Sequence, residues 1–417
     1  MPAAGSSGPC PELRVTSIAH GLVYPWSIAF LPGSQDALVT ERPGRIRRVR
    51  EHGLGAPLRG VPSVTNLLDI APAPDFSRSA RVYFSLVREE EDAYALEVWT
   101  AVVTADALGE ARRVYRARAP SAFPTALNSG RLFVLGPRDF IVSIADFDDR
   151  QSRAQEPASH WGKLVHVRES AEPRLIARGV RNVQGIARDA EGVLWFTDHG
   201  PRGGDELNAL RIGANYGWPL VSAGDHYDGT LVPAEAPHGL PVAPPIVHWT
   251  PAIAPSSLLF YEGPEFPEWR GSLFIGSLAQ RHVRRIEMRS GVIRSEQILL
   301  SELGERIRDV RSDASGRLYV LTDGYHGRIL RIERATLPGS CGIAGQAPDG
   351  LALVSPDRCR GLRPRADLLQ SEEASRRAEG GQLGCEGARP VARTGTRSLP
   401  VARCRFLSRA AVGRGRQ

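Results

Sequence analysis

The stretch Pro25–Glu51 reads PWSIAFLPGSQDALVTERPGRIRRVRE, and a similar pattern returns at Arg306–Glu333 as RIRDVRSDASGRLYVLTDGYHGRILRIE. Each stretch has a short apolar run, a turn rich in Gly, Asp or Ser, and a second run that ends in Thr and an acidic residue. A Gly turn and a run in which Arg alternates with Ile or Val follow. Alternation with a period of two between Gly turns is typical of β-hairpins. The two stretches therefore predict repeated antiparallel strands.

The same pattern occurs in looser form between these two stretches. The looser copies are NLLDIAPAPDFSRSARVYFSLV from Asn66, SGRLFVLGPRDFIVSIADF from Ser129, VQGIARDAEGVLWFTDHG from Val183 and PSSLLFYEGPEFPEWRGSLFIGSL from Pro255. Six units spaced by roughly 40 to 70 residues suit the blades of a β-propeller, with a pair of β-sandwiches as the alternative. Apolar residues at helical spacing occur only in short segments near Glu206 and Ser301. We predict an all-β, six-bladed β-propeller over residues 15–336.

Charge and cysteine are concentrated at the ends of the chain. Residues 338–417 hold fourteen arginines and seven acidic residues and so account for the whole formal charge of +7, which leaves a neutral body and argues against nucleic-acid binding. The five cysteines are Cys10, Cys341, Cys359, Cys385 and Cys404, so the body has neither a disulfide framework nor a thiolate metal site. With one aromatic residue, the tail at 337–417 is predicted to be disordered, as is a flexible leader at 1–14.

Targeting signals are absent from the visible sequence. No run of eighteen apolar residues occurs, so no membrane-spanning helix is expected. The start, MPAAGSSGPCPEL, has neither the basic residues nor the apolar core of a signal peptide. The sequence therefore gives no export signal of its own.

The loop TDHGPRGGDELN, residues 197–208, follows a strand-like run and combines glycines with acids. Three glycines allow the backbone to turn sharply and to direct carbonyl oxygens inward, and Asp205 and Glu206 add carboxylates. Such oxygen-rich loops suit a hard cation such as calcium. The alternative is a solvated turn in which Asp205 caps the next segment and Asn208 bonds locally. Composition alone leaves both interpretations open.

Several motifs in order resemble one family. They are the first-blade stretch GLVYPWSIAFLPGSQDALVTERPGRIRRV, RNVQG at Arg181, HGPRGGDELN at His199, GANYGWP at Gly213, WTPAIAPSS at Trp249 and GERIRDV at Gly304. Together they are similar to the soluble glucose, sorbosone and aldose sugar dehydrogenases that depend on pyrroloquinoline quinone (PQQ), from about residue 15 to residue 334. The resemblance implies a six-bladed propeller with PQQ and calcium over the central channel, a small sugar as substrate and an external electron acceptor. It also implies a periplasmic or extracellular location, and it leaves the oligomeric state open.

The resemblance also assigns roles to individual residues. It implies that the carbonyls of Gly200 and Pro201 bind the calcium beside the cofactor. It implies a second, structural calcium at Glu206 and the backbone of Tyr216, with Asp205 close by. The residues implied to hold the quinone are Arg181, Asn182, Arg306 and Arg308. Trp249 is implied to line the sugar site, and packing in the interior is the alternative.

The chemistry makes these residue types sensible. PQQ carries three carboxylates, which arginine binds through paired hydrogen bonds while it stays charged. Alternation places Arg306 and Arg308 on one face of their strand. Calcium at the quinone carbonyl acts as a Lewis acid. Ordinary surface charge, or an ion pair with Asp309, is the alternative for these arginines.

The sequence departs from the family at the catalytic base. The stretch LNSGRL has Leu127 where the family has a histidine that removes the proton of the sugar hydroxyl, and an isobutyl group cannot accept a proton. Asp146 in SIADF, which orients that histidine in the family, is retained, whereas Val64 stands at about the place of a glutamine near the cofactor. We interpret His199 and His160 as surface or packing residues.

Three functions remain open at this stage. The first, which we favour, is a calcium- and PQQ-dependent sugar dehydrogenase impaired at Leu127. The second is a degenerate propeller that keeps calcium for stability and binds a glycan or a protein. The third is a calcium-dependent hydrolase, since other six-bladed propellers activate water at a channel calcium. Lys163, the only lysine, is predicted to be a surface strand residue without a catalytic role.

Overall fold

The computed structural model describes residues 11–51, 53–127, 129–147, 153–289 and 291–335, together with two short strands near the C-terminus. The strands form six sheets, antiparallel except where the short β17 joins β13 in parallel, and each sheet begins at or next to one of the six repeats seen in the sequence. The predicted six-bladed propeller is therefore confirmed, and the β-sandwich alternative is wrong.

The first three blades follow one another along the chain. Blade 1 consists of β2 (Pro25–Phe30), β3 (Ala37–Glu41), β4 (Arg45–Arg50) and β5 (Gly53–Pro57). Blade 2 consists of β6 (Asn66–Pro72), β7 (Arg81–Glu90), β8 (Ala93–Val103) and β9 (Leu108–Arg116), with α1 (Phe76–Ser79) between its first two strands. After η1 (Pro124–Leu127), blade 3 consists of β10 (Leu132–Gly136), β11 (Asp139–Ile144), β12 (Lys163–Arg168), β13 (Arg174–Arg178) and the two-residue β17 (Ala214–Asn215).

The other three blades complete the ring. Blade 4 consists of β14 (Val183–Arg188), β15 (Leu194–Asp198), β16 (Asp205–Ala209) and β18 (Val247–Trp249). Blade 5 consists of β19 (Leu259–Tyr261), β20 (Ser272–Ser277), β21 (His282–Arg289) and β22 (Val292–Leu299), with η2 (Pro267–Trp269). After η3 (Ser301–Leu303), blade 6 consists of β23 (Ile307–Ser312), β24 (Leu318–Thr322), β25 (Gly327–Arg334) and β1 (Leu13–Leu22).

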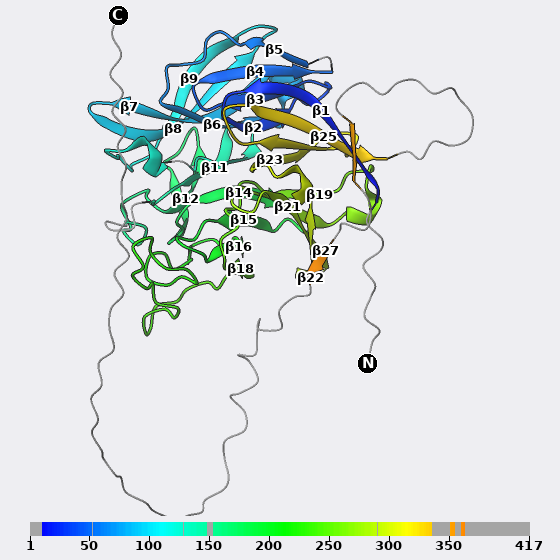
Figure 1. Cartoon of the computed structure of the whole chain (residues 1–417). Coiled ribbons are helices and arrows are strands. Elements are labelled where there is room, and N and C mark those ends of the chain that lie inside the picture. Colours follow the sequence, from blue (N-terminus) through cyan, green and yellow to red (C-terminus); the bar gives the residue numbers. More distant parts are fainter. Residues whose placement is uncertain are drawn as a thin grey trace, which may run out of the picture. The chain divides into compact units, whose positions relative to one another are not determined.

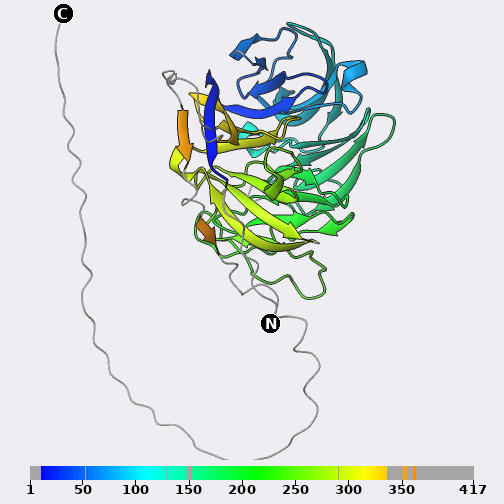
Figure 2. The ribbon, with the colours of Figure 1, turned by 90° about the vertical axis from the view of Figure 1, so that its right-hand side faces the viewer.

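The first strands of neighbouring blades contact one another all the way round, from β2 through β6, β10, β14, β19 and β23 and back to β2. The ring closes because β1, from the N-terminal side, pairs with β25 in blade 6, with Leu13 opposite Arg334. Figures 1 and 2 show these two strands, blue and yellow, side by side. Apolar clusters fill the spaces between blades, so each blade is stabilised by its two neighbours.

Two segments of the predicted tail add strands to this ring. β26 (Leu351–Val354) pairs with β1, and β27 (Arg360–Leu362) pairs with β22. The rest of the tail and residues 1–10 of the predicted leader lie outside the described residues. No helix in the described part of the chain is long and apolar enough to cross a membrane. The segment near Glu206 is a strand rather than a helix, and Ser301 opens a single 3-10 turn.

A buried arginine joins the blades near the centre of the ring. Arg131, next to β10, is fully buried and pairs with Asp69 of β6 at 3.1 Å. Its other nitrogens donate to the carbonyls of Gln184 in β14, at 2.6 Å, and of Ser256 before β19, at 3.0 Å. Arg131 thus connects blades 2, 3, 4 and 5.

The remaining two blades join the same network through Asp309 of β23. Its Oδ1 lies 3.7 Å from Arg131, and its Oδ2 accepts the amide hydrogen of Ile28 in β2 at 3.0 Å. The guanidinium of Arg131 also lies 4.2 Å from the ring of Trp26, also in β2. All six innermost regions therefore meet in one network of hydrogen bonds and ion pairs, which sequence patterns did not reveal.

Candidate cofactor and metal site

The loop between β15 and β16 makes a tight turn. A side chain at Gly200 would lie 2.1 Å from the Gly203 carbonyl oxygen, and Gly204 has a φ of 69°, so glycine is required at both places. Asp205 holds the turn, because its Oδ1 accepts the amide hydrogen of Gly200 at 2.9 Å. Its Oδ2 accepts two amides from the segment at 253–254, at 2.6 and 2.7 Å. Asp205 opens a strand and caps no helix.

An acidic residue at the end of the second strand anchors the start of the first strand in blade 4. Asp198, the last residue of β15, accepts the amide hydrogens of Arg181 at 2.9 Å and of Asn182 at 2.6 Å. The repeated pair of Thr and an acid in the sequence marks this position in other blades as well. In blade 6 the same place is occupied by Asp323, directly after β24.

Asp323 brings the two predicted quinone arginines together. Its two oxygens accept from Arg306 at 3.1 Å and from Arg308 at 3.3 Å. Burial opposes ionisation, but the two guanidiniums hold the pKa of Asp323 below its usual value. The alternative partner, Asp309, pairs instead with Arg131 and with Arg311 of the same strand. The shared face predicted for Arg306 and Arg308 agrees with their common partner.

A series of side-chain hydrogen bonds links Arg308 to Asn182. Arg308 donates to Oε1 of Gln184 at 3.4 Å, and Nε2 of Gln184 donates to Oδ1 of Asn182 at 2.9 Å. The series therefore runs from blade 6 to blade 4. Neither Gln184 nor Asp323 was singled out from the sequence, although the repeated Thr and acid would have identified Asp323.

Arg181 lies on the glycine turn itself. Its Nη1 donates to the carbonyl oxygen of Gly200 at 2.8 Å. Its guanidinium carbon lies 4.3 Å from the ring centre of Phe147, 5.2 Å from that of Trp218 and 5.6 Å from that of Tyr227. The carbonyl oxygen and the three aromatic rings hold the guanidinium in place beside the turn.

His199 lies close to arginines from blades 4 and 6. Its Nε2 donates to the carbonyl of Pro255 at 2.7 Å. Burial lowers the pKa of His199 to about 3, and the positive charges of Arg181, Arg308 and Arg306 contribute to the shift. The arginines of blades 4 and 6 therefore lie near enough to His199 for their charges to act on its ring. A histidine with so low a pKa is a weak general base.

A cavity of about 10 Å³, the size of one water or ion, lies beside the turn. Glu206, Tyr216 and Asp198 line it, together with Gly200. Burial and the charge of Asp198 raise the pKa of Glu206 to about 8, and burial raises that of Asp198 to about 6. Burial and mutual repulsion disfavour the ionised forms of these carboxyl groups, and a divalent cation in the cavity would stabilise those ionised forms.

The donors around the cavity fit calcium only if backbone oxygens take part. Among the described residues, no cluster of three His, Cys, Asp or Glu is arranged to hold a metal ion. Calcium accepts carbonyl oxygens readily, and the side-chain oxygen Oδ1 of Asn208 is buried without a partner. Pro201 is buried in the same turn. The residues present thus fit a calcium bound by Glu206 and carbonyl groups.

The position at which the resemblance implies a catalytic base lies at the end of η1. Leu127 is the last residue of this 3-10 turn, ahead of β10. Asp146 lies beside the site, because its amide donates to the carbonyl of Arg181 at 2.7 Å. Its Oδ2 accepts the amide hydrogen of Arg153 at 2.8 Å, and its side chain is buried. Val64 lies beside Gly44, where an added Cβ would come within 2.9 Å of its Cγ2.

Three other residues have structural environments. Trp249 is 7 % exposed and donates to Glu296 at 3.0 Å, within the apolar cluster between blades 4 and 5, which favours the packing alternative. Nδ1 of His160 accepts the hydroxyl of Tyr115 at 2.6 Å, and its ring is buried, as expected for a packing histidine. The prediction of a surface position for Lys163 is wrong, because Lys163 is buried in β12. Its ammonium group donates to three backbone carbonyls, and these hydrogen bonds offset the cost of burying its charge.

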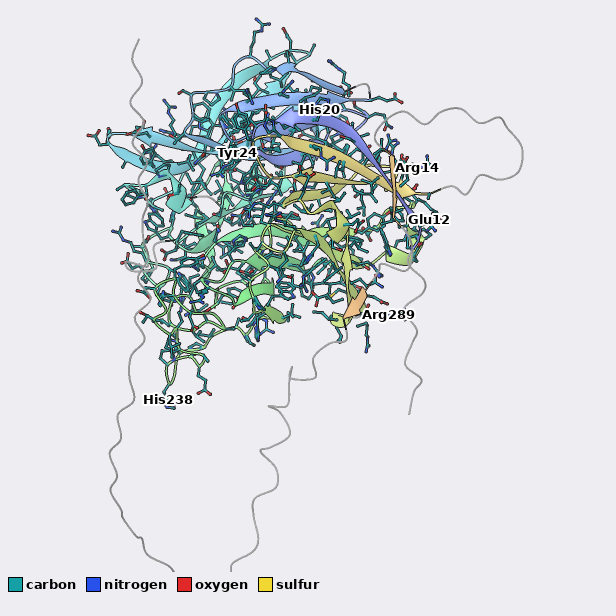
Figure 3. All side chains as sticks on the ribbon, viewed as in Figure 1. Glu12, Arg14, His20, Tyr24, His238 and Arg289 are labelled. Atoms are coloured by element: carbon teal, nitrogen blue, oxygen red, sulfur yellow. The ribbon has the colours of Figure 1, made fainter. Side chains whose placement is uncertain are left out.

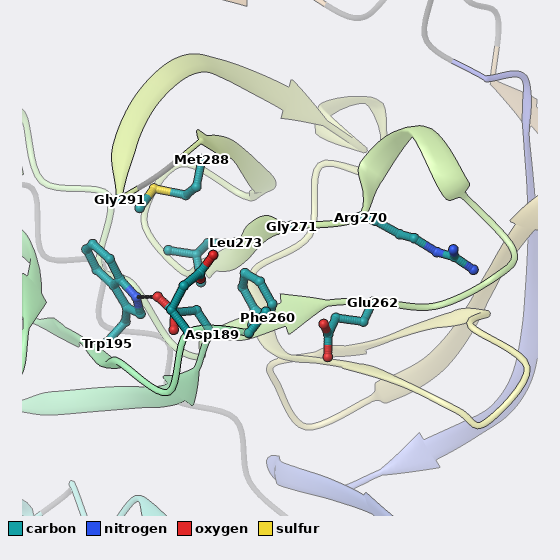
Figure 4. A pocket seen from close by; sticks show the side chains of 11 residues that line it. Asp189, Trp195, Phe260, Glu262, Arg270, Gly271, Leu273, Met288 and Gly291 are labelled. Atoms are coloured by element: carbon teal, nitrogen blue, oxygen red, sulfur yellow. Dashed lines mark hydrogen bonds between the residues drawn. The ribbon is translucent and has the colours of Figure 1, made fainter.

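A larger cavity of about 420 Å³ lies between blades 4 and 5 (Figure 4). Trp195, Phe260 and Met288 form part of its wall, and Trp195 donates to Asp189 at 2.8 Å. Asp189 lies in the turn between β14 and β15, at the opposite end of β15 from Asp198. None of the residues that line this cavity belongs to the arginine cluster or the glycine turn.

The sequence and the fold match known proteins. The sequence model of the family described as glucose/sorbosone dehydrogenase matches residues 22–331. The aldose sugar dehydrogenase YliI of Escherichia coli strain K12 is 33 % identical over 345 residues, which cover 77 % of this chain and 92 % of that protein.

Solved structures agree. A crystal structure of a glucose dehydrogenase is 36 % identical, with a TM-score of 0.72, over 76 % of this chain and 98 % of that chain. The PQQ-bound aldose sugar dehydrogenase of Streptomyces coelicolor is 26 % identical, with a TM-score of 0.61, over 78 % of this chain and 99 % of that chain.

Proposed function

Because the chain belongs to the glucose/sorbosone dehydrogenase family of soluble, PQQ-dependent sugar dehydrogenases, we propose that it binds calcium and PQQ at the turn 199–205 and oxidises aldose sugars slowly. The family makes the chain a quinone-dependent oxidoreductase that acts on CH–OH groups. The observation that carries the proposed site is the hydrogen bond from Arg181 to Gly200 of the turn, together with the side-chain hydrogen bonds from Arg308 through Gln184 to Asn182 that join blade 6 to the start of blade 4.

The residues of the chain have separate roles in this proposal. Arg306 and Arg308 bind carboxylates of the cofactor, and Asp323 sets the direction of both guanidiniums. Arg181 and Asn182 bind from blade 4, where Asp198 fixes their backbone. Held by these residues, PQQ would supply a hydride acceptor for the sugar, and calcium beside it would supply Lewis-acid polarisation of the quinone.

The metal site is proposed in two parts. The carbonyls of Gly200 and Pro201 bind the calcium next to the cofactor, and Glu206 and the carbonyl of Tyr216 bind a structural calcium in the small cavity. Asp205 acts on the first of these by holding the turn through the amide of Gly200. The assignments rest on the family motif and, for Gly200, Glu206 and Tyr216, on their position around the small cavity.

The proton of the sugar hydroxyl has no efficient acceptor in this proposal. Leu127 stands where the family has the general base, and Asp146, which is retained, has no histidine to orient. Loss of a general base lowers a rate by about 10² to 10⁴. We therefore expect a correctly loaded enzyme with slow turnover, located in the periplasm or outside the cell, that passes electrons to an external acceptor.

The test begins with cofactor loading. Recombinant protein is mixed with calcium and PQQ, desalted, and its absorbance spectrum is recorded before a dye-linked assay with glucose and maltose. Retained quinone with slow sugar oxidation supports the proposal. Quinone that does not stay with the protein contradicts it. A melting temperature raised by calcium without quinone binding indicates the degenerate propeller, and lactone hydrolysis without quinone indicates the hydrolase.

A further inference from the structure

Two aromatic side chains next to Arg181 are partly exposed, although the arginine that they contact is buried. Phe147 is 37 % exposed and Tyr227 is 61 % exposed. Both rings nevertheless lie within 6 Å of the same guanidinium, which itself is only 1 % exposed. One side of each ring therefore covers Arg181, while the rest of each ring is exposed.

The backbone fixes both rings where they stand. Phe147 directly follows Asp146, whose amide is bonded to the carbonyl of Arg181. Tyr227 lies in a tight turn closed by a hydrogen bond from the amide of Gly229 to the carbonyl of His226. The turn is tied to the glycine turn through paired backbone bonds between Arg202 and Asp225. The two rings are thus parts of the site and not loose surface residues.

The long connection that carries Tyr227 is anchored in the interior through Trp218 and Val232, which form a small buried cluster with Ala154. It leaves blade 3 after β17 and returns at β18, and His238 marks its extended tip in Figure 3. Near its start, Trp218 is buried, lines the small cavity, and has an indole N–H without an acceptor among the described residues. The connection therefore supplies both an exposed ring and an unused donor to the site.

We propose that Phe147 and Tyr227 form an aromatic wall that stacks against the pyranose ring of the sugar substrate. The apolar C–H face of a pyranose packs well on aromatic rings, which are the usual lining of small-ligand sites. The proposed role rests on the sugar-dehydrogenase function of the same site. In this proposal Phe147 and Tyr227 take the sugar-lining role that the resemblance assigned to Trp249. Trp249 lies in the interior and donates to Glu296.

The experiment measures sugar affinity apart from turnover. Protein loaded with calcium and pre-reduced PQQ, which cannot oxidise sugar, is titrated with glucose and with maltose by calorimetry. Phe147→Ala and Tyr227→Ala should each raise the sugar Kd about threefold to tenfold, since one stacking contact is lost. Phe147→Tyr and Tyr227→Phe keep the rings and should stay within about twofold of the wild type.

Tyr325→Ala is the matched control, because Tyr325 is also 61 % exposed but lies beside Tyr24 in blade 6. It should leave the sugar Kd unchanged. Quinone content is measured for every variant. Unchanged sugar affinity in both alanine variants would overturn the proposed wall.

Other outcomes separate the wall from the function of the site. Weaker quinone binding with unchanged sugar affinity would overturn the wall and show that Phe147 only positions Arg181. An equal loss of sugar affinity in Tyr325→Ala would also overturn it. If the wild type retains no quinone, the proposed function fails first, and the wall fails with it.

Discussion

Arg131 and Asp69 form a buried ion pair, 3.1 Å long, at the place where the innermost strands of the six blades meet. Each partner also forms hydrogen bonds with backbone groups of other strands, so the pair connects several blades. Asp69 accepts the amide of Leu132 at 2.7 Å as well as the hydroxyl of Ser27 at 2.6 Å.

Arg131→Met should therefore destabilise the whole ring. The change leaves Asp69 buried without its cation and removes one of the two arginines beside Asp309, and breaking such a buried pair costs about 3–5 kcal/mol. Urea unfolding followed by circular dichroism measures the loss. Arg59→Met is the control, because Arg59 and Asp106 form an exposed pair worth at most about 1 kcal/mol. Equal losses in the two variants would contradict the central role of Arg131.

Leu127→His should raise the rate of sugar oxidation. A histidine at this position supplies the missing proton acceptor, and the expected gain in kcat is about 10² to 10⁴. The dye-linked assay of protein loaded with calcium and PQQ measures it. Leu127→Gln, which has no basic nitrogen, is the matched control. In a second step, Asp146→Asn in the histidine variant should remove much of the gain, and a gain that survives this change would argue against the orienting role of Asp146.

Arg308→Met should weaken quinone binding by about tenfold to a hundredfold. Hydrogen bonds between charged partners contribute about 1.5–3 kcal/mol, and methionine keeps the apolar stem while it removes the charge. Fluorescence titration with PQQ in the presence of calcium gives the Kd. Arg289→Met, which changes an exposed residue of blade 5, should have no effect. The assignment fails if both variants bind PQQ as the wild type does.

Calcium should raise the melting temperature, and Glu206→Gln should remove most of this rise. A ligand that binds only the folded protein stabilises it by about 2.7 kcal/mol at a hundred times its Kd. Glutamine keeps the shape of the side chain and removes the charge that attracts the ion. Differential scanning calorimetry with calcium or with magnesium provides the comparison. A rise of equal size in Glu206→Gln would place the stabilising ion elsewhere.

His160 should make the protein less stable in mild acid. Burial lowers its pKa to about 4, whereas an unfolded histidine has a pKa near 6.5. The unfolded chain therefore takes up a proton at a higher pH, so stability is lost as the pH falls from about 6.5 towards 4. Urea unfolding at a series of pH values measures the slope. In His160→Gln this slope should be shallower, and an unchanged slope would assign the acid sensitivity to other groups.

The fold could be predicted from the sequence because each repeat shows the pattern of a β-hairpin locally. Alternation of Arg with Ile or Val in β4 and β25, and the Gly turns before them, indicate strands wherever they occur. The central network could not be predicted, because Arg131, Asp69 and Asp309 come from three blades and their meeting depends on ring closure. Burial of Lys163 was missed for a related reason: its three carbonyl partners come from turns rather than from a recognisable pattern.

The site was partly visible in the sequence. The motifs placed Gly200, Arg181, Arg306 and Arg308 in one site, and the hydrogen bonds and charges around them are consistent with that placement. Phe147 and Tyr227 were not found, because a single aromatic residue in a loop has no pattern that separates a binding role from a packing role. Their importance depends on distances to Arg181, which only the folded chain provides.

The pairing of β1 with β25 has a consequence for synthesis on the ribosome. Translation makes β1 first, but its partner is complete only once Arg334 has left the exit tunnel. For most of that time the nascent chain carries an unpaired strand edge, which is a template for association with other chains. A message truncated before codon 327 would yield a product whose N-terminal strand never finds this partner, so chaperones and proteases would encounter an exposed edge rather than a smaller version of the protein.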